Sequence, residues 1–138
     1  KSNDEIMCGL IFDPIKDEMF YAEKNNGAFF NNERIRVSKK NELSECLFAT
    51  GGKKYNSVSE ISTRKSGCAA LDLAYVASGR YDGYWHREIN YWDIAAGIIL
   101  VKESGGFVES LNSSSFSEKK IDIIATNSKI HKELKNLL

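Results

Sequence analysis

An aspartate next to a tryptophan is the residue in this sequence best placed for chemistry. The stretch "YWDIAAGIILVKESGG" (91–106) predicts a helix that begins at Asp93, is apolar on almost every face and stops at Gly105-Gly106. A carboxylate at the head of a buried helix can cap the free N–H groups of the first turn, or it can offer a hard oxygen ligand to Mg²⁺. The residues alone favour the cap and leave the metal site open.

A turn of small residues, "SGCAA" (66–70), is the second candidate, at the start of a helix predicted for 68–79. Gly67, Cys68 and Ala69 would let a ligand approach the backbone N–H groups of the first turn. The same composition suits a helix packed tightly against its neighbour, and the sequence does not choose between the two. Nothing in the local sequence suggests a base partner for Cys68, which argues against a cysteine nucleophile.

The elements that must position these residues alternate between strands and helices. Turn residues predict two hairpins in the first 38 residues and polar loops at 53–62 and 112–120. The predicted strands are 6–12, 19–24, a second hairpin within 25–38, 46–52, 80–86, 107–110 and 121–127; the predicted helices are 68–79, the Asp93 helix and 130–138. This alternation predicts a layered α/β domain.

The composition excludes several classes of protein. Nineteen basic and 19 acidic side chains give a formal net charge of zero, which argues against a general nucleic-acid or membrane surface. No apolar run approaches the roughly 18–20 residues of a membrane span. Cys8, Cys46 and Cys68 are odd in number and lie in apolar contexts, so we expect reduced, buried thiols and a cytoplasmic protein.

Three segments carry a resemblance to a known family. "GCAALDLAYVASGRYDGYW" (67–85) followed by "WDIAAGIILVKESGG" (92–106) resembles the bacterial type of the inositol monophosphatase family. "GLIFDPIKDEMFYAEKNNGAFFNNERIRVS" (9–38) resembles the family's hairpin and its Asn-rich turn. The similarity extends over nearly the whole chain in the same order. It implies a sugar-phosphatase fold, an α/β arrangement of mixed sheet and buried helices, and a homo-oligomer.

The resemblance also implies roles for the two candidates. Asp93 matches the family aspartate that binds catalytic Mg²⁺ and faces the substrate, and Trp92 would then pack in the core at the entry to the helix. Gly67, Cys68 and Ala69 match the turn that contacts the ring and phosphate of the substrate. Cys68 stands where the family usually has Ser or Thr, so a hydroxyl hydrogen bond is lost.

His86 departs from the family in a position that bears on specificity. The family usually has a Glu there, which accepts hydrogen bonds from inositol hydroxyls, whereas a His can accept only one such bond. Glu88 lies two residues on and would share the side of His86 in an extended strand, so it could substitute. The alternative is that Glu88 simply faces solvent.

The main metal motifs of the family are missing from this sequence. They are an Asp-Pro-x-Asp-Gly-Thr/Ser turn and an upstream Glu; "DPIKDE" (13–18) has the Asp-Pro but no Gly-Thr, and it corresponds to a hairpin turn instead. Because the chain starts with Lys1, we expect residues 1–138 to form a single domain equivalent to the C-terminal half of the enzyme. The family normally has a longer loop and a helix between the 46–52 strand and the 66–70 turn, whereas this sequence has only the polar stretch 53–62. Either the protein has a deletion there, or residues are missing from the sequence.

The function implied is Mg²⁺-dependent hydrolysis of a phosphate monoester, an inositol phosphate or a related sugar or polyol phosphate. We expect the isolated chain to have little activity, because one carboxylate makes a poor Mg²⁺ site. The alternative is a non-catalytic remnant that acts as a binding or interaction module. In both cases the face that would meet the missing half should be apolar, and it should pair with that half or with a second copy.

Overall fold

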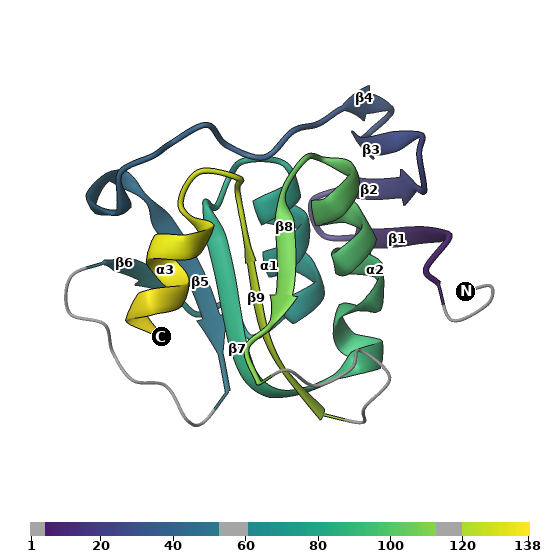
Figure 1. Cartoon of the computed structure of the whole chain (residues 1–138). Helices are drawn as coiled ribbons and strands as arrows, with labels where there is room; N and C mark the ends of the chain where they lie inside the picture. The colour runs from purple at the N-terminus through teal and green to yellow at the C-terminus, as the bar shows by residue number, and fades with distance from the viewer. Residues whose placement is uncertain (1–4, 53–60, 113–119) are drawn as a thin grey trace.

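The structure, a computed structural model, describes residues 5–52, 61–112 and 120–138. Within these residues the chain forms four layers: a small sheet, a pair of helices, a larger sheet and a third helix on the far side (Figure 1). The predicted loops at 53–62 and 112–120 fall almost wholly outside the described residues. The layering confirms the predicted α/β class.

The small sheet is an antiparallel meander of consecutive strands. Its strands, in spatial order, are β1 (Cys8–Asp13), β2 (Glu18–Glu23), β3 (Gly27–Phe30) and β4 (Glu33–Arg34). Asp13 ends β1, and its carboxylate accepts hydrogen bonds from the backbone N–H groups of Ile15 and Lys16 at 3.0 and 3.3 Å. The "DPIKDE" carboxylate is therefore used in the hairpin turn, as predicted.

The larger sheet is mixed. Its strands, in spatial order, are β6 (Ser62–Arg64), β5 (Leu47–Gly51), β7 (Gly83–Asn90), β9 (Lys120–Thr126) and β8 (Phe107–Ser110). β5 runs parallel to both β6 and β7, whereas β9 runs antiparallel to β7 and β8. β7 begins three residues later than the predicted 80–86 strand and continues to Asn90, and β6 was not predicted.

Helices α1 (Ala69–Ala77) and α2 (Tyr91–Glu103) lie between the two sheets, and α3 (His131–Leu137) covers the opposite face of the larger sheet (Figure 1). A 3₁₀ turn, Leu43–Glu45, precedes β5. β7 serves both cores because its side chains alternate: Tyr84 packs against the helix layer and Trp85 packs against α3. None of the helices in the described ranges is long and apolar enough to cross a membrane.

α2 is the central element of the fold. Residues 97–101 of α2 are all buried, and Gly97 touches α1 so closely that a Cβ there would lie 2.5 Å from Leu73. At its C-terminal end the Glu103 carboxylate accepts hydrogen bonds, both of 3.0 Å, from the backbone N–H groups of Asn25 and Gly27, which fastens the small sheet to α2. The helix begins at Tyr91, two residues before the predicted start.

The cysteines differ from the expectation in part. All three are free thiols, but only Cys46 is buried; Cys8 and Cys68 are exposed. Burial raises the pKa of the Cys46 thiol to about 11, so this thiol stays protonated. Cys8 is exposed because it lies on the outer face of β1, where alternate residues point away from α2.

Gly97→Ala should lower the free energy of unfolding by about 1–3 kcal/mol, because the added methyl group overpacks the contact with Leu73. The gain in helix propensity, about 1 kcal/mol, offsets only part of this cost. Urea unfolding measures the change. Lys132→Ala, an exposed position on α3, is the control and should stay within about 0.5 kcal/mol. A Gly97→Ala variant as stable as the parent would contradict the close helix contact.

Candidate active site

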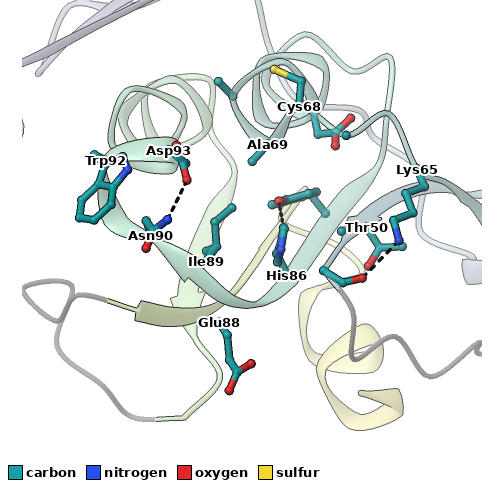
Figure 2. A pocket seen from close by; sticks show the side chains of 16 residues that line it. Thr50, Lys65, Cys68, Ala69, His86, Glu88, Ile89, Asn90, Trp92 and Asp93 are labelled. Carbon is teal, nitrogen blue, oxygen red and sulfur yellow. Dashed lines mark hydrogen bonds between the residues drawn. The ribbon is translucent and has the colours of Figure 1, made fainter.

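A cavity of about 570 Å³ lies where the N-termini of α1 and α2 meet the ends of β5 and β7 (Figure 2). All five residues predicted for the site line it: Gly67, Cys68, Ala69, His86 and Asp93. The first three come from the turn at the start of α1, and the other two come from one stretch further along the chain, where His86 precedes Asp93 by seven residues, so the fold brings the turn to this stretch. Sequence reasoning missed the other polar lining residues used below, namely Thr50, Lys65, Asp72 and Tyr84.

Asp93 is exposed in the first turn of α2 and faces the cavity (Figure 2). In the part of the chain that is described, its carboxylate accepts a hydrogen bond from Asn90 Nδ2 at 3.3 Å. Asn90 is the N-cap residue and makes no side-chain capping bond. The carboxylate is therefore directed into the cavity, where it can face a bound cation.

The N-terminus of α1 forms the opposite wall. Gly67 has φ +85°, a left-handed conformation that suits glycine, and it turns the chain into the helix. Cys68 is the N-cap residue and makes no capping bond through its thiol. The N–H groups of the first turn have no partner within the helix, so Ala69 and Ala70 present donors toward the cavity. This arrangement suits an anionic ligand.

Asp72 is buried in the same wall. Its Oδ1 accepts a hydrogen bond of 2.7 Å from the Ser66 hydroxyl, and the Ser66 oxygen accepts one of 3.1 Å from the backbone N–H of Cys68. Burial raises the pKa of Asp72 to about 6, and the hydrogen bond from Ser66 lowers it less. The signal in the sequence was a lone carboxylate inside the apolar run "AALDLAYVA".

His86 projects from β7 between the two walls. Its Nδ1 lies 2.7 Å from the hydroxyl oxygen of Tyr84, which is fully buried. Burial raises the pKa of Tyr84, so the phenol stays protonated. Burial, followed by the charge of Lys65, lowers the pKa of His86, so the imidazole is neutral at pH 7.

The end of β5 leaves room for the imidazole. A Cβ on Gly51 would lie 2.6 Å from the His86 ring, and a Cβ on Gly52 would lie 3.0 Å from Nε2. Gly51 pairs with His86 in the β5–β7 register, so the imidazole ring fills the space that a side chain at position 51 would take. Beside them, Thr50 is buried, and its hydroxyl has no hydrogen-bond partner in the described residues.

The expectation that Glu88 shares the side of His86 is not met, and the structure agrees with the alternative of an exposed Glu88 side chain. β7 shifts register between His86 and Ile89, and Glu88 has φ +58°, so the two-residue alternation is broken there. The Glu88 side chain is exposed and points away from the other labelled side chains (Figure 2). Its backbone N–H donates a 2.7 Å hydrogen bond to Asp122, which holds the irregular turn.

Trp92 does not pack in the core. It is 64% exposed and lines the cavity beside Asp93. The expectation failed because α2 starts at Tyr91, which puts Trp92 in the exposed part of the first turn; Ile94 is the first fully buried residue of the helix. An indole at the rim offers an apolar surface to a ligand in the cavity.

The residues that line the cavity supply one ligand for a metal ion, and they do not form a complete metal site. Asp93 supplies hard carboxylate oxygens of the kind that Mg²⁺ prefers. No group of three His, Cys, Asp or Glu side chains close enough to hold a metal ion occurs in residues 5–52, 61–112 and 120–138. Further ligands would have to come from elsewhere.

Comparison with known proteins gives consistent matches. Residues 2–138 match the profile of the inositol monophosphatase family. An inositol-1-monophosphatase of Caulobacter vibrioides is 33% identical over 150 residues, which cover 97% of this chain and 59% of that protein. A fructose-1,6-bisphosphatase/inositol-1-monophosphatase of Thermotoga maritima is 41% identical over 140 residues, which cover 96% and 55%.

A solved structure shows the same fold. The crystal structure of extragenic suppressor protein suhB from Bartonella henselae aligns with a TM-score of 0.91 and 44% identity, over 99% of this chain and 60% of that one. These matches define the class, a family of metal-dependent phosphatases. This chain belongs to the inositol monophosphatase family. It spans somewhat more than half the length of the relatives it matches.

Asp72→Asn should change the dependence of stability on pH. Because the folded pKa of Asp72 is raised from 3.8 to about 6, the folded state favours the protonated acid. The contribution of Asp72 to stability is therefore largest below about pH 4 and falls by up to about 3 kcal/mol as the pH rises through 6. The amide has no such loss, so the two free energies of unfolding should diverge over this interval in urea titrations. Asp17→Asn, in the exposed β1–β2 turn, is the control; parallel profiles for Asp72→Asn and the parent would overturn the assignment.

Proposed function

We propose that this chain is part of a Mg²⁺-dependent phosphomonoesterase that hydrolyses an inositol phosphate or a related sugar or polyol phosphate. The observation that carries the proposal is the cavity itself, in which one exposed carboxylate faces the free N–H groups of a helix N-terminus. A phosphate ester with a bound cation suits both groups, because the cation can bind the carboxylate and the phosphate oxygens can accept hydrogen bonds from the N–H groups. Membership of the inositol monophosphatase family supports the same reaction class.

Each predicted residue has a distinct part in this proposal. Asp93 holds the cation and faces the hydroxyl groups of the substrate. The first turn of α1, from Gly67 through Ala69, receives phosphate or ring oxygens on its backbone N–H groups. Mg²⁺, when bound, neutralises phosphoryl oxygens and lowers the pKa of a water molecule. His86, which lies between Asp93 and Lys65 in Figure 2, faces another part of the substrate.

The proposal leaves the isolated chain with little activity. One carboxylate is a poor Mg²⁺ site, because this ion gives up its water molecules reluctantly and needs several oxygen ligands. The relatives are longer than this chain, and the remaining ligands would come from the part of them that it does not span. The names of two relatives, inositol-1-monophosphatase and fructose-1,6-bisphosphatase/inositol-1-monophosphatase, support sugar and polyol phosphates as the substrate class.

Asp93→Asn should lower Mg²⁺-dependent phosphate release from inositol 1-phosphate by more than about 100-fold, because loss of a group that only supports a metal ligand already costs 10–100-fold. The assay uses the gene product as the cell makes it, with its intact mass measured first. Asp17→Asn makes the same chemical change outside the cavity and should leave the rate unchanged. Phosphate release that survives Asp93→Asn, or that needs no divalent ion, would contradict the proposal.

An apolar sheet face supports a partner for this chain. The outer face of the small sheet exposes Leu10 and Phe12 on β1 and Met19 on β2, with Tyr21 and Phe29 beside them. The opposite face of this sheet packs on α2, so the sheet is apolar on both sides. Sheets of that kind are normally covered on both faces. We propose that the part of the relatives that this chain does not span, or a second copy of the chain, covers the outer face.

Leu10→Glu combined with Met19→Glu should abolish this association, because two buried charges would then have no partners. Sedimentation of the chain, alone and mixed with the N-terminal part of the Bartonella relative, measures it. Ile15→Glu is the matched control, since Ile15 is 94% exposed in the β1–β2 turn and outside this face. A parent chain that stays monomeric in both samples would contradict the proposed association. A parent chain that forms a dimer with itself and does not bind the added N-terminal part would show that the second copy covers this face.

A further inference from the structure

We propose that the wall of the cavity formed by His86, Lys65 and the Gly51-Gly52 backbone binds a second anionic group of the substrate. The preferred substrates would then be phosphate monoesters that carry another phosphate or a carboxylate at the end remote from Asp93. The inference rests on the proposed function, since the same cavity takes the ester. It assigns this chain a specificity that a Glu at position 86 would not give.

The hydrogen bond between Tyr84 and His86 determines which atom the imidazole presents. The Tyr84 hydroxyl is fully buried, and within the described residues its recorded partner is Nδ1 of His86, at 2.7 Å. A buried hydroxyl proton left without an acceptor is costly, so the hydroxyl donates and Nδ1 accepts. The neutral ring then carries its hydrogen on Nε2. Tyr84 is thus a positioning residue that makes His86 a hydrogen-bond donor.

The donating nitrogen faces the ligand space beside the end of β5. The ring lies against Gly51 and Gly52, where a side chain would collide with it, and no hydrogen bond to Nε2 is recorded in the described residues. His86 is only partly buried, so Nε2 can meet a ligand that fills the cavity. A carboxylate at this position would accept hydrogen bonds from sugar hydroxyls; the imidazole instead donates one.

Lys65 supplies a charge to the same wall. Its Nζ donates a 3.2 Å hydrogen bond to the carbonyl oxygen of Gly52, and among residues 5–52, 61–112 and 120–138 this is its one hydrogen bond, so an ammonium group with three donors can also serve a ligand. Figure 2 shows His86 between Asp93 and Lys65, so Lys65 lies on the far side of the imidazole from Asp93. Of the other lining carboxylates, Asp72 is bonded to Ser66, and the Glu88 side chain is directed away from the other labelled side chains. The Asp93 end of the cavity is therefore acidic and the Lys65 end is basic.

This asymmetry matches a ligand with two different ends. A cation at Asp93 would take the phosphate ester that reacts, and the Lys65–His86 wall would take an anion through charge-assisted hydrogen bonds. A neutral hydroxyl at that wall gains only weaker bonds. Two such bonds are enough to favour the doubly anionic ligand by about 10–100-fold.

Binding of three ligands on one scaffold tests the inference. Glucose 1-phosphate, glucose 1,6-bisphosphate and glucuronic acid 1-phosphate differ only in the group at carbon 6, which is a hydroxyl, a phosphate or a carboxylate. Titration calorimetry on the purified protein should show tighter binding of one or both doubly anionic ligands by about 10–100-fold. Comparison of the bisphosphate with the glucuronic acid derivative shows whether this wall prefers a phosphate or a carboxylate. Equal affinities for all three ligands, or no measurable binding of any, would overturn the inference.

Variants locate the effect. His86→Glu should reduce the preference to about one, and Lys65→Gln should reduce it severalfold, whereas Lys132→Gln on α3 should leave it unchanged. His86→Gln keeps an N–H donor and should retain part of the preference, which separates lost donation from a disturbed fold. The ¹⁵N spectrum of His86 should show Nε2 as the protonated nitrogen, and Tyr84→Phe should remove that bias. A preference that persists in His86→Glu would assign the anion to another part of the cavity.

The outcome is separable from that of the proposed function. Mg²⁺-dependent phosphate release at equal efficiency from singly and doubly anionic esters would retain the phosphatase and overturn the second anion subsite. Preferential binding of the doubly anionic ligands, with no release from any ester even when the part of the relatives that this chain does not span is present, would retain the subsite and overturn the phosphatase.

Discussion

The close contact between α1 and α2 is the constraint on which the rest of the structure depends. Gly97 lets the two helices lie side by side between the sheets, and both helices begin at the same cavity. The free N–H groups and the positive ends of two helix dipoles therefore converge on one place. An incoming anion is favoured there. A bulkier residue at position 97 would separate the helices and disperse the site.

β7 supplies the floor that completes the cavity. Its alternation sends Tyr84 and His86 toward the helices while Trp85 packs against α3, so one strand joins the site to both cores. The irregularity between His86 and Ile89 then leaves the Glu88 side chain exposed and directed away from the other labelled side chains. The parallel pairing with β5 brings Gly51 opposite His86. The orientation of one imidazole thus depends on two strands, β7 through Tyr84 and β5 through Gly51.

The sequence predicts most of the elements, because turn residues and apolar runs bound them clearly. Local patterns single out Asp93 and the Gly67 turn only as helix starts; the family resemblance made them, together with His86, candidates for the site, and all five candidate residues line one cavity. Thr50 and Tyr84 were missed because they join the site only through the register of β5 and β7, and Lys65 was missed because it follows β6, a strand that was not predicted. Trp92 was misplaced because its burial depends on a shift of two residues at the helix start that periodicity does not reveal. The two alternatives for Glu88 stayed open because they depend on a strand irregularity that periodicity does not reveal either.

The most direct test of the account is where a divalent ion binds. Mn²⁺ takes the same oxygen ligands as Mg²⁺ and broadens the NMR signals of nearby nuclei, even when it binds weakly. At low Mn²⁺ concentration the amide signals of residues 90–94 and of Gly67 through Ala69 should broaden first, and Asp93→Asn should abolish this selectivity. Broadening scattered over the exposed carboxylates of the chain, or left unchanged by Asp93→Asn, would contradict the account.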